Sequence, residues 1–149
     1  MNIRLKYSYR KFPDEPSEAF PRRHSALRPV IPITLINGNQ RITYLALIDS
    51  GADLCIAHAE IGEQIGIEVE SGKSFTFYGI SKKPEPLKAY RHDIKIEVGG
   101  YQFDCTFGFT RDIPNMPYGI LGQIDFFKIF DVFFDYNKER MELMKRSNG

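Results

Sequence analysis

The chain has 149 residues, of which 42% are hydrophobic, and 20 lysines and arginines stand against 19 acidic residues to leave a net charge of +1. This length and hydrophobic content suit one domain with a single core. A net charge so close to zero excludes a global field that would recruit nucleic acid or an anionic membrane surface. We therefore expect a partner that is recognised by shape and local chemistry.

The chain shows no targeting or membrane-spanning pattern. Its first residues alternate apolar and polar types, which a signal peptide does not do, and no stretch approaches the roughly 18 apolar residues of a membrane span. These observations predict a soluble, cytoplasmic protein. Cys55 and Cys105 lie on separate apolar segments with neither CxxC nor zinc-ligand spacing, which favours buried free thiols.

The N-terminal part divides into a strand and an extension. Alternation at Ile3, Leu5, Tyr7 and Tyr9 predicts a strand, whereas prolines and charges fill residues 11–29. We expect an irregular excursion over the surface there. The sequence thus predicts an N-terminal strand and extension at 1–29, followed by the main domain at 30–146.

Period-two patterns with turn residues between them predict a mainly β domain after residue 29. A β-branched run at 30–36 and an apolar run at 42–48 flank Asn37-Gly38, a strong hairpin signal. We expect a short helix after His58, ending near Gly66. The further predicted elements are strands at 73–80, 87–98 and 101–109, a polar loop tip at 81–86, a short apolar segment at 118–122, a helix at 123–130, and a closing hairpin at 131–136 and 140–144.

Asp49 is the informative residue, because an apolar strand runs directly into Asp49-Ser50-Gly51-Ala52-Asp53. A carboxylate just past a buried strand is costly unless something pairs it or uses it. The ordinary alternative is that Asp49 caps the following turn through backbone N–H groups. The functional alternative is a catalytic carboxylate.

A second element, Gly119-Ile120-Leu121-Gly122, precedes the Phe-rich helix. Alone, it is an ordinary strand-to-helix packing point. The order of the Asp49 segment, the hairpin around residue 80 and this element resembles the retropepsin family of aspartic proteases, most of all its single-domain bacterial and archaeal members. The correspondence runs from about residue 30 to residue 144.

This resemblance implies an all-β, retropepsin-like half-barrel with one short C-terminal helix. It implies an active site that is completed by homodimerisation, with Asp49 as the catalytic residue of each chain. By the same correspondence Ser50, Gly51 and Ala52 support the carboxylate. Residues that bind substrate would be Asp53, Gly79, Ile80 and Ile120. Neither cofactor nor metal is implied, and the three histidines lack metal-ligand spacing.

Two positions depart from the viral members of the family. Those enzymes carry an Arg after the apolar-apolar-Gly strand, placed to pair with the second Asp of the loop, where this chain has Gln123. The hairpin tip contains Pro84 and Pro86 and is poorer in glycine. The partner of Asp53 and the contacts of the tip are therefore left open.

Two functions follow from the sequence. The first is an aspartic endopeptidase that acts as a homodimer on peptides or unfolded proteins, with no nucleic-acid or membrane partner. The alternative is a catalytically silent retropepsin-fold module for peptide binding or assembly, since fold resemblance alone does not establish activity. A third idea, that residues 11–29 cover the groove or the dimer surface as a regulator, rests only on their length and composition.

Overall fold

The computed structural model describes residues 3–78, 85–113 and 117–145. Within these ranges strands dominate, with one α-helix, one 3-10 turn and one π-helical segment. The elements are β1 (Ile3–Ser8), β2 (Arg10–Pro13), β3 (Ser25–Arg28), β4 (Val30–Asn37), β5 (Gln40–Ile48), β6 (Cys55–His58), α1 (Ala59–Gln64), η1 (Val69–Ser71), β7 (Lys73–Phe77), β8 (Leu87–Val98), β9 (Tyr101–Thr110), β10 (Gly119–Leu121), η2 (Gln123–Phe127), β11 (Phe130–Asp135) and β12 (Arg140–Lys145).

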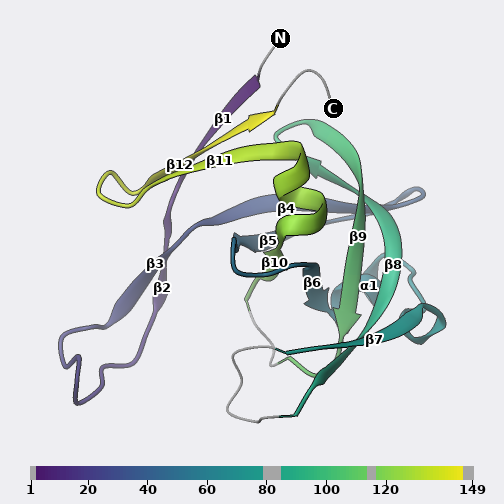
Figure 1. Cartoon of the computed structure of the whole chain (residues 1–149), viewed down its shortest axis with the longest axis horizontal. Helices are drawn as coiled ribbons and strands as arrows, with labels where there is room; N and C mark the ends of the chain where they lie inside the picture. The colour runs from purple at the N-terminus through teal and green to yellow at the C-terminus, as the bar shows by residue number, and fades with distance from the viewer. Residues whose placement is uncertain (1–2, 79–84, 114–116, 146–149) are drawn as a thin grey trace.

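The body of the molecule is a seven-stranded sheet that closes on itself (Figure 1). Its strand order is β4-β5-β10-β6-β9-β8-β7, and β4 also pairs with β8. Alternate side chains of these strands point inward, so β-branched and aromatic residues fill the interior. Phe107, Phe109 and Leu121 are among the fully buried core residues. The all-β prediction is confirmed.

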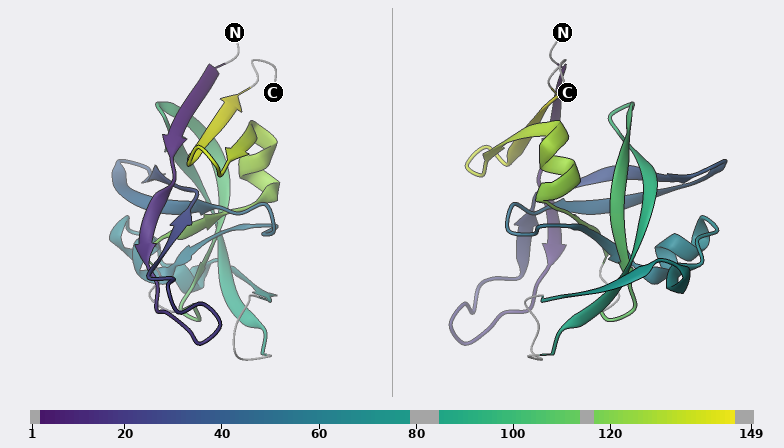
Figure 2. Two further views of the ribbon diagram at one scale, coloured as in Figure 1. Left: turned by 90° about the vertical axis from the view of Figure 1, so that its left-hand side faces the viewer. Right: turned by 45° about the vertical axis from the view of Figure 1, so that its right-hand side comes forward.

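The two ends of the described chain meet in a second, three-stranded sheet of order β1-β12-β11. β1 is antiparallel to β12, with Ile3 opposite Lys145 and Leu5 opposite Leu143. The N- and C-terminal strands therefore lie side by side, as both views of Figure 2 show. Leu143 and Met141 are fully buried and join this sheet to the core.

The prediction of an irregular segment over residues 11–29 was wrong in part. β2 and β3 form an antiparallel hairpin in which Phe12 lies opposite Ala26, and this hairpin projects from the body (Figure 1). Each strand has only four residues, too few to show the alternation that reveals a longer strand. Residues 14–24 between them remain irregular, as expected.

The helix at 123–130 was predicted too long and too regular. Residues Gln123–Phe127 are wound as a π-helix, with the Phe127 N–H pointing at the Gly122 carbonyl at 3.5 Å, and Phe130 already begins β11. The wider winding leaves Phe126 and Phe130 together in the core, with ring centroids 5.2 Å apart. π-helical turns are rare and occur frequently at functional sites.

Other elements agree with the sequence to within a few residues. The helix after His58 forms and ends before Gly66. The hairpins expected at Asn37-Gly38 and Gly99-Gly100 also form, with positive φ angles at Gly38, Gly99 and Gly100, while Asn37 still belongs to β4. Strand β6 was not predicted, because its four residues carry no alternation. No helix in residues 3–78, 85–113 or 117–145 is long and apolar enough to cross a membrane.

Candidate active site

Asp49 lies where β5 leaves the core. Ala46 and Ile48 of β5 are buried, and Asp49 itself is half-buried. Its backbone N–H donates to the carbonyl of Leu121 at 3.0 Å, at the end of β10, which runs parallel to β5. Ile48 and Leu121, the buried last residues of β5 and β10, thus fix the position of the Asp49 backbone.

The carboxylate of Asp49 is held by its own loop. The Gly51 N–H donates to Asp49 Oδ1 at 2.9 Å, and the Ala52 N–H donates to the Asp49 carbonyl at 3.1 Å. A Cβ at Gly51 would lie 3.3 Å from Asp49 Oδ1, which is tighter than ordinary contact. The loop therefore turns back on the carboxylate and orients it through an N–H donor.

The start of η2 holds the same loop from the other side. The Gln123 N–H donates to the Ala52 carbonyl at 2.8 Å, and the Ile124 N–H donates to the Asp53 carbonyl at 2.9 Å. These N–H groups belong to the first turn of the helix, where no partner exists within the helix. The first turn of η2 thus holds the backbone of the Asp49 loop through two hydrogen bonds.

The side chain of Gln123 is a third anchor that the sequence did not reveal. Its Nε2 donates to the carbonyl of Ser50 at 2.7 Å. Gln123 thus binds the backbone of the loop. The resemblance to the viral enzymes raised Gln123 only as a departure from Arg. Nothing in the sequence around Gln123 predicts that its amide binds the loop.

Asp53 and Ser50 are exposed at the edge of the site. In the described residues the Asp53 carboxylate has no hydrogen bond or ion pair, so the question of its partner stays open within this chain. Ile120 lies between Leu47 of β5 and Ile56 of β6 and is half-buried. The structure brings Asp49, Asp53 and Ile120 to one end of the closed sheet.

Gly79 and Ile80, the two other predicted contact residues, lie outside the described residues. The strand that leads toward them, β7, is described to Phe77 and pairs with β8 through Phe77 and Leu87.

Gly122 permits the close packing on which the site rests. A Cβ at this position would lie 2.5 Å from the Leu54 carbonyl oxygen, and its φ of −109° is ordinary. Space, and not backbone conformation, therefore demands glycine here. The Gly122 N–H points at Sγ of Cys55 at 3.4 Å.

The two cysteines are buried free thiols, as predicted. A hydrogen bond with Cys55 and burial raise the pKa of the Cys105 thiol above its ordinary value. Cys105 therefore stays protonated, and the pair packs as part of the core beneath the loop.

Two of the three histidines have structural roles. Nδ1 of His58 accepts the Glu60 N–H at 3.1 Å and caps α1. His92 Nε2 lies 2.8 Å from the Val69 carbonyl. Within the described residues no group of three or more His, Cys, Asp or Glu side chains is placed to hold a metal ion.

The projecting hairpin touches the site region through one aromatic contact. Phe12 of β2 and Tyr118, which immediately precedes β10, meet edge to face with ring centroids 5.1 Å apart. The sequence gave no hint of this contact, since the two residues belong to distant segments. It places the hairpin beside the strand that carries Ile120.

No protein-family model matches the sequence, and comparison with curated proteins finds no match. Solved structures do match. A retropepsin-like aspartic protease from Rickettsia conorii aligns with a TM-score of 0.62 and 13% identity over 97% of this chain and 92% of the other. The retroviral protease-like domain of Ddi1 from Leishmania major gives a TM-score of 0.52 and 18% identity over 74% of this chain and 82% of the other.

EIAV protease in complex with the inhibitor HBY-793 also aligns, with a TM-score of 0.45 and 17% identity over 64% of this chain and 82% of the other. The fold is carried by the first two alignments, which have the higher TM-scores. The chain therefore has a retropepsin-like fold, and its neighbours in structure are aspartic proteases.

Proposed function

We propose that this protein is an aspartic endopeptidase whose active site forms when two copies bring their Asp49 carboxylates together. The observation that carries the proposal is the position of Asp49. It follows a buried strand on a retropepsin-like fold, and its carboxylate is oriented by the Gly51 N–H at 2.9 Å. A loop tied down on both sides provides the rigidity that catalysis needs.

Chemistry requires two carboxylates. Each chain contributes one Asp49, and a two-fold axis places its mate opposite. Two carboxylates about 3 Å apart do not both stay ionised, so the pair shares one proton and titrates as a unit. The ionised member takes a proton from a bound water, and the neutral member donates to the scissile carbonyl oxygen. This hydrolysis uses no metal and no covalent intermediate.

The other residues of the loop hold and orient. In this proposal the Ser50 hydroxyl, which is exposed, bonds across the dimer axis, while Gly51 and Ala52 keep the carboxylate in place. Asp53 and Ile120 line the groove for the peptide, and Gly79 and Ile80 close over it.

The surface around the loop is consistent with a second copy. Ile124 is 52% exposed although its N–H is bonded to the loop at Asp53. Gln123 and Gly51 beside it are exposed as well. An apolar side chain left open next to a half-site is the kind of group that dimerisation covers.

Cleavage of an unstructured protein such as casein, measured between about pH 4 and 7, tests the proposal. Wild type and Asp49→Asn are compared at matched concentrations while light scattering reports the dimer. We expect activity that rises steeply with dimer content and vanishes in Asp49→Asn. A dimer that cleaves nothing at any pH contradicts the proposal.

Two observations favour a second candidate, a silent module that binds peptides. Gln123 binds the Ser50 carbonyl at 2.7 Å, and the Asp53 carboxylate is unpaired in the described residues. This candidate predicts peptide binding that is unchanged in Asp49→Asn, together with no cleavage by wild type.

A further inference from the structure

A cavity lies between the projecting hairpin and the turn that joins β11 to β12, away from Asp49. Its volume is about 450 Å³. Residues 25–28, the whole of β3, border it in an unbroken run, together with Lys11, Arg23, Tyr136 and Glu139. Consecutive residues of a strand border one space only when that space follows the strand. The cavity is therefore elongated along β3.

Two of the three cations that border this cavity have no acidic partner in the described residues. Arg28 is half-buried, and neither Arg28 nor Lys11 has an ion pair or side-chain hydrogen bond in the described residues. Arg10 lies directly opposite Arg28 in the β2–β3 pairing. Like charges that face each other across two strands are destabilising. Only Arg23 is neutralised, by Asp14 at 3.2 Å.

Several cations elsewhere in the described residues are paired. Arg41 meets Glu97 at 3.2 Å, Lys95 meets Asp104 at 3.0 Å, and Arg111 meets Glu70 at 2.6 Å. Lys11 and Arg28 have no such partner in the described residues, and both border the cavity. Positive charge in a concave site attracts anions more strongly than it does on a flat surface.

We propose that the cavity along β3 is a binding site for an extended, acidic polypeptide segment. β3 pairs on one side only, with β2, so its other edge offers backbone groups to an added strand. Carboxylates of that strand would meet Lys11 and the fork of Arg28. Tyr136, which is 65% exposed, provides an aromatic face beside them.

This site goes beyond the proposed function, because binding at β3 needs neither Asp49 nor a second chain. Glu139 is the one acidic residue that borders the cavity, so it opposes an acidic ligand. Removing the charges of Lys11 and Arg28 should therefore weaken the binding of an acidic peptide, and removing the charge of Glu139 should strengthen it.

Fluorescence anisotropy of a short labelled peptide of alternating Glu and Thr tests the site, with full-length Asp49→Asn protein as the background so that the peptide stays intact. Replacing both cations, Lys11→Gln with Arg28→Gln, weakens binding by about tenfold, as two lost and partly exposed charge pairs would. Glu139→Gln strengthens binding. The same peptide with Gln in place of Glu binds none of the variants.

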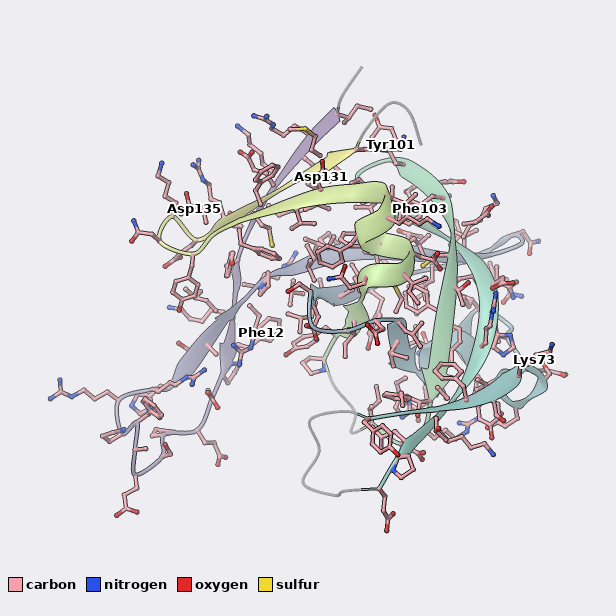
Figure 3. The ribbon with its side chains drawn as sticks, in the orientation of Figure 1. Phe12, Lys73, Tyr101, Phe103, Asp131 and Asp135 are labelled. Atoms are coloured by element: carbon pink, nitrogen blue, oxygen red, sulfur yellow. The ribbon has the colours of Figure 1, made fainter. Side chains whose placement is uncertain are left out.

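Lys73→Gln with Lys128→Gln is the matched control, since it removes the same two charges from exposed positions. Lys73 lies on the opposite side of the molecule from Phe12 and the hairpin (Figure 3). We expect unchanged affinity in this control, with circular dichroism verifying that each variant is folded. Equal weakening in the two double variants, or no strengthening in Glu139→Gln, overturns the proposal.

Discussion

The loop of Asp49 and the β2–β3 hairpin are held in opposite ways. The loop is bonded to β10 and to η2 through neutral backbone and amide groups, over a core of fully buried side chains. The hairpin projects from the body and touches the site region through the ring of Phe12 on Tyr118. The Asp49 loop therefore has a fixed geometry, whereas the hairpin carries cations without acidic partners in the described residues and makes few contacts with the body.

This difference predicts that the two regions contribute to different properties, the loop to folding stability and activity and the hairpin to ligand binding. Changes beneath the loop should cost folding free energy and activity together, because the same packing supplies both. Changes in the hairpin should leave the core intact and alter what the protein binds. Substitutions matched in chemistry and placed in the two regions can break this comparison.

Phe126→Ala and Phe12→Ala form the first pair. Phe126 is fully buried against Phe130 and Phe127, so its loss leaves a cavity that costs about 4 kcal/mol of unfolding free energy. Phe12 is half-buried and loses one ring contact, which costs about 1 kcal/mol. Urea unfolding measures both. Equal losses would show that the hairpin is as much a part of the core as η2.

Gly122→Ala and Gly38→Ala are the second pair, in which the reference position lies in the exposed turn between β4 and β5 instead of the β2–β3 hairpin. The new methyl group at residue 122 meets the Leu54 carbonyl oxygen at 2.5 Å, and backbone there has nowhere to move, so about 3 kcal/mol is lost. At Gly38 the added Cβ has nothing within 4 Å, and only its φ of +61° opposes it, at about 1 kcal/mol. A cost at residue 122 no greater than at residue 38 would show that the two segments are free to separate.

Gln123→Ala removes one hydrogen bond to the loop and should cost about 1 kcal/mol of stability. If the proposed function is right, kcat falls more than this loss of stability explains, while KM for peptide changes little, because the side chain orients the loop. Gln123→Met keeps the length of the side chain and serves as control. Full activity in both variants would remove Gln123 from the account.

The smallest effect concerns the ion pair between Arg111 and Glu70. The hydrogen bond from Arg111 lowers the pKa of Glu70. A lowered folded pKa contributes stability above the unfolded value of about 4.3, and this contribution disappears as pH falls through the folded pKa. Arg111→Gln should therefore lower Tm slightly at neutral pH and not at all in strong acid. A Tm difference that persists in acid would assign the effect to packing.

The sequence predicted those elements that long apolar patterns define. Alternation over residues 87–98 and the turn residues at Gly38 and Gly99 were sufficient for the long strands of the closed sheet, although not for the four-residue strand β6. The apolar run into Asp49 marked the candidate site. Strands of four residues carry too little pattern, so β2 and β3 were predicted to be irregular.

Features made by tertiary contact were beyond the sequence. The π-helical winding depends on where Phe126 and Phe130 meet the core, and a helix of ordinary period was the natural expectation. The contact of Gln123 with Ser50 and that of Phe12 with Tyr118 each join distant segments. No local propensity encodes such contacts.

The most direct measurement mixes wild type and Asp49→Asn chains at constant total concentration, after unfolding and refolding them together. If two Asp49 carboxylates share one site, only dimers of two wild-type chains cleave, so an equal mixture retains about one quarter of the wild-type activity. Retention of one half would mean that each chain acts alone, and it would contradict the shared site.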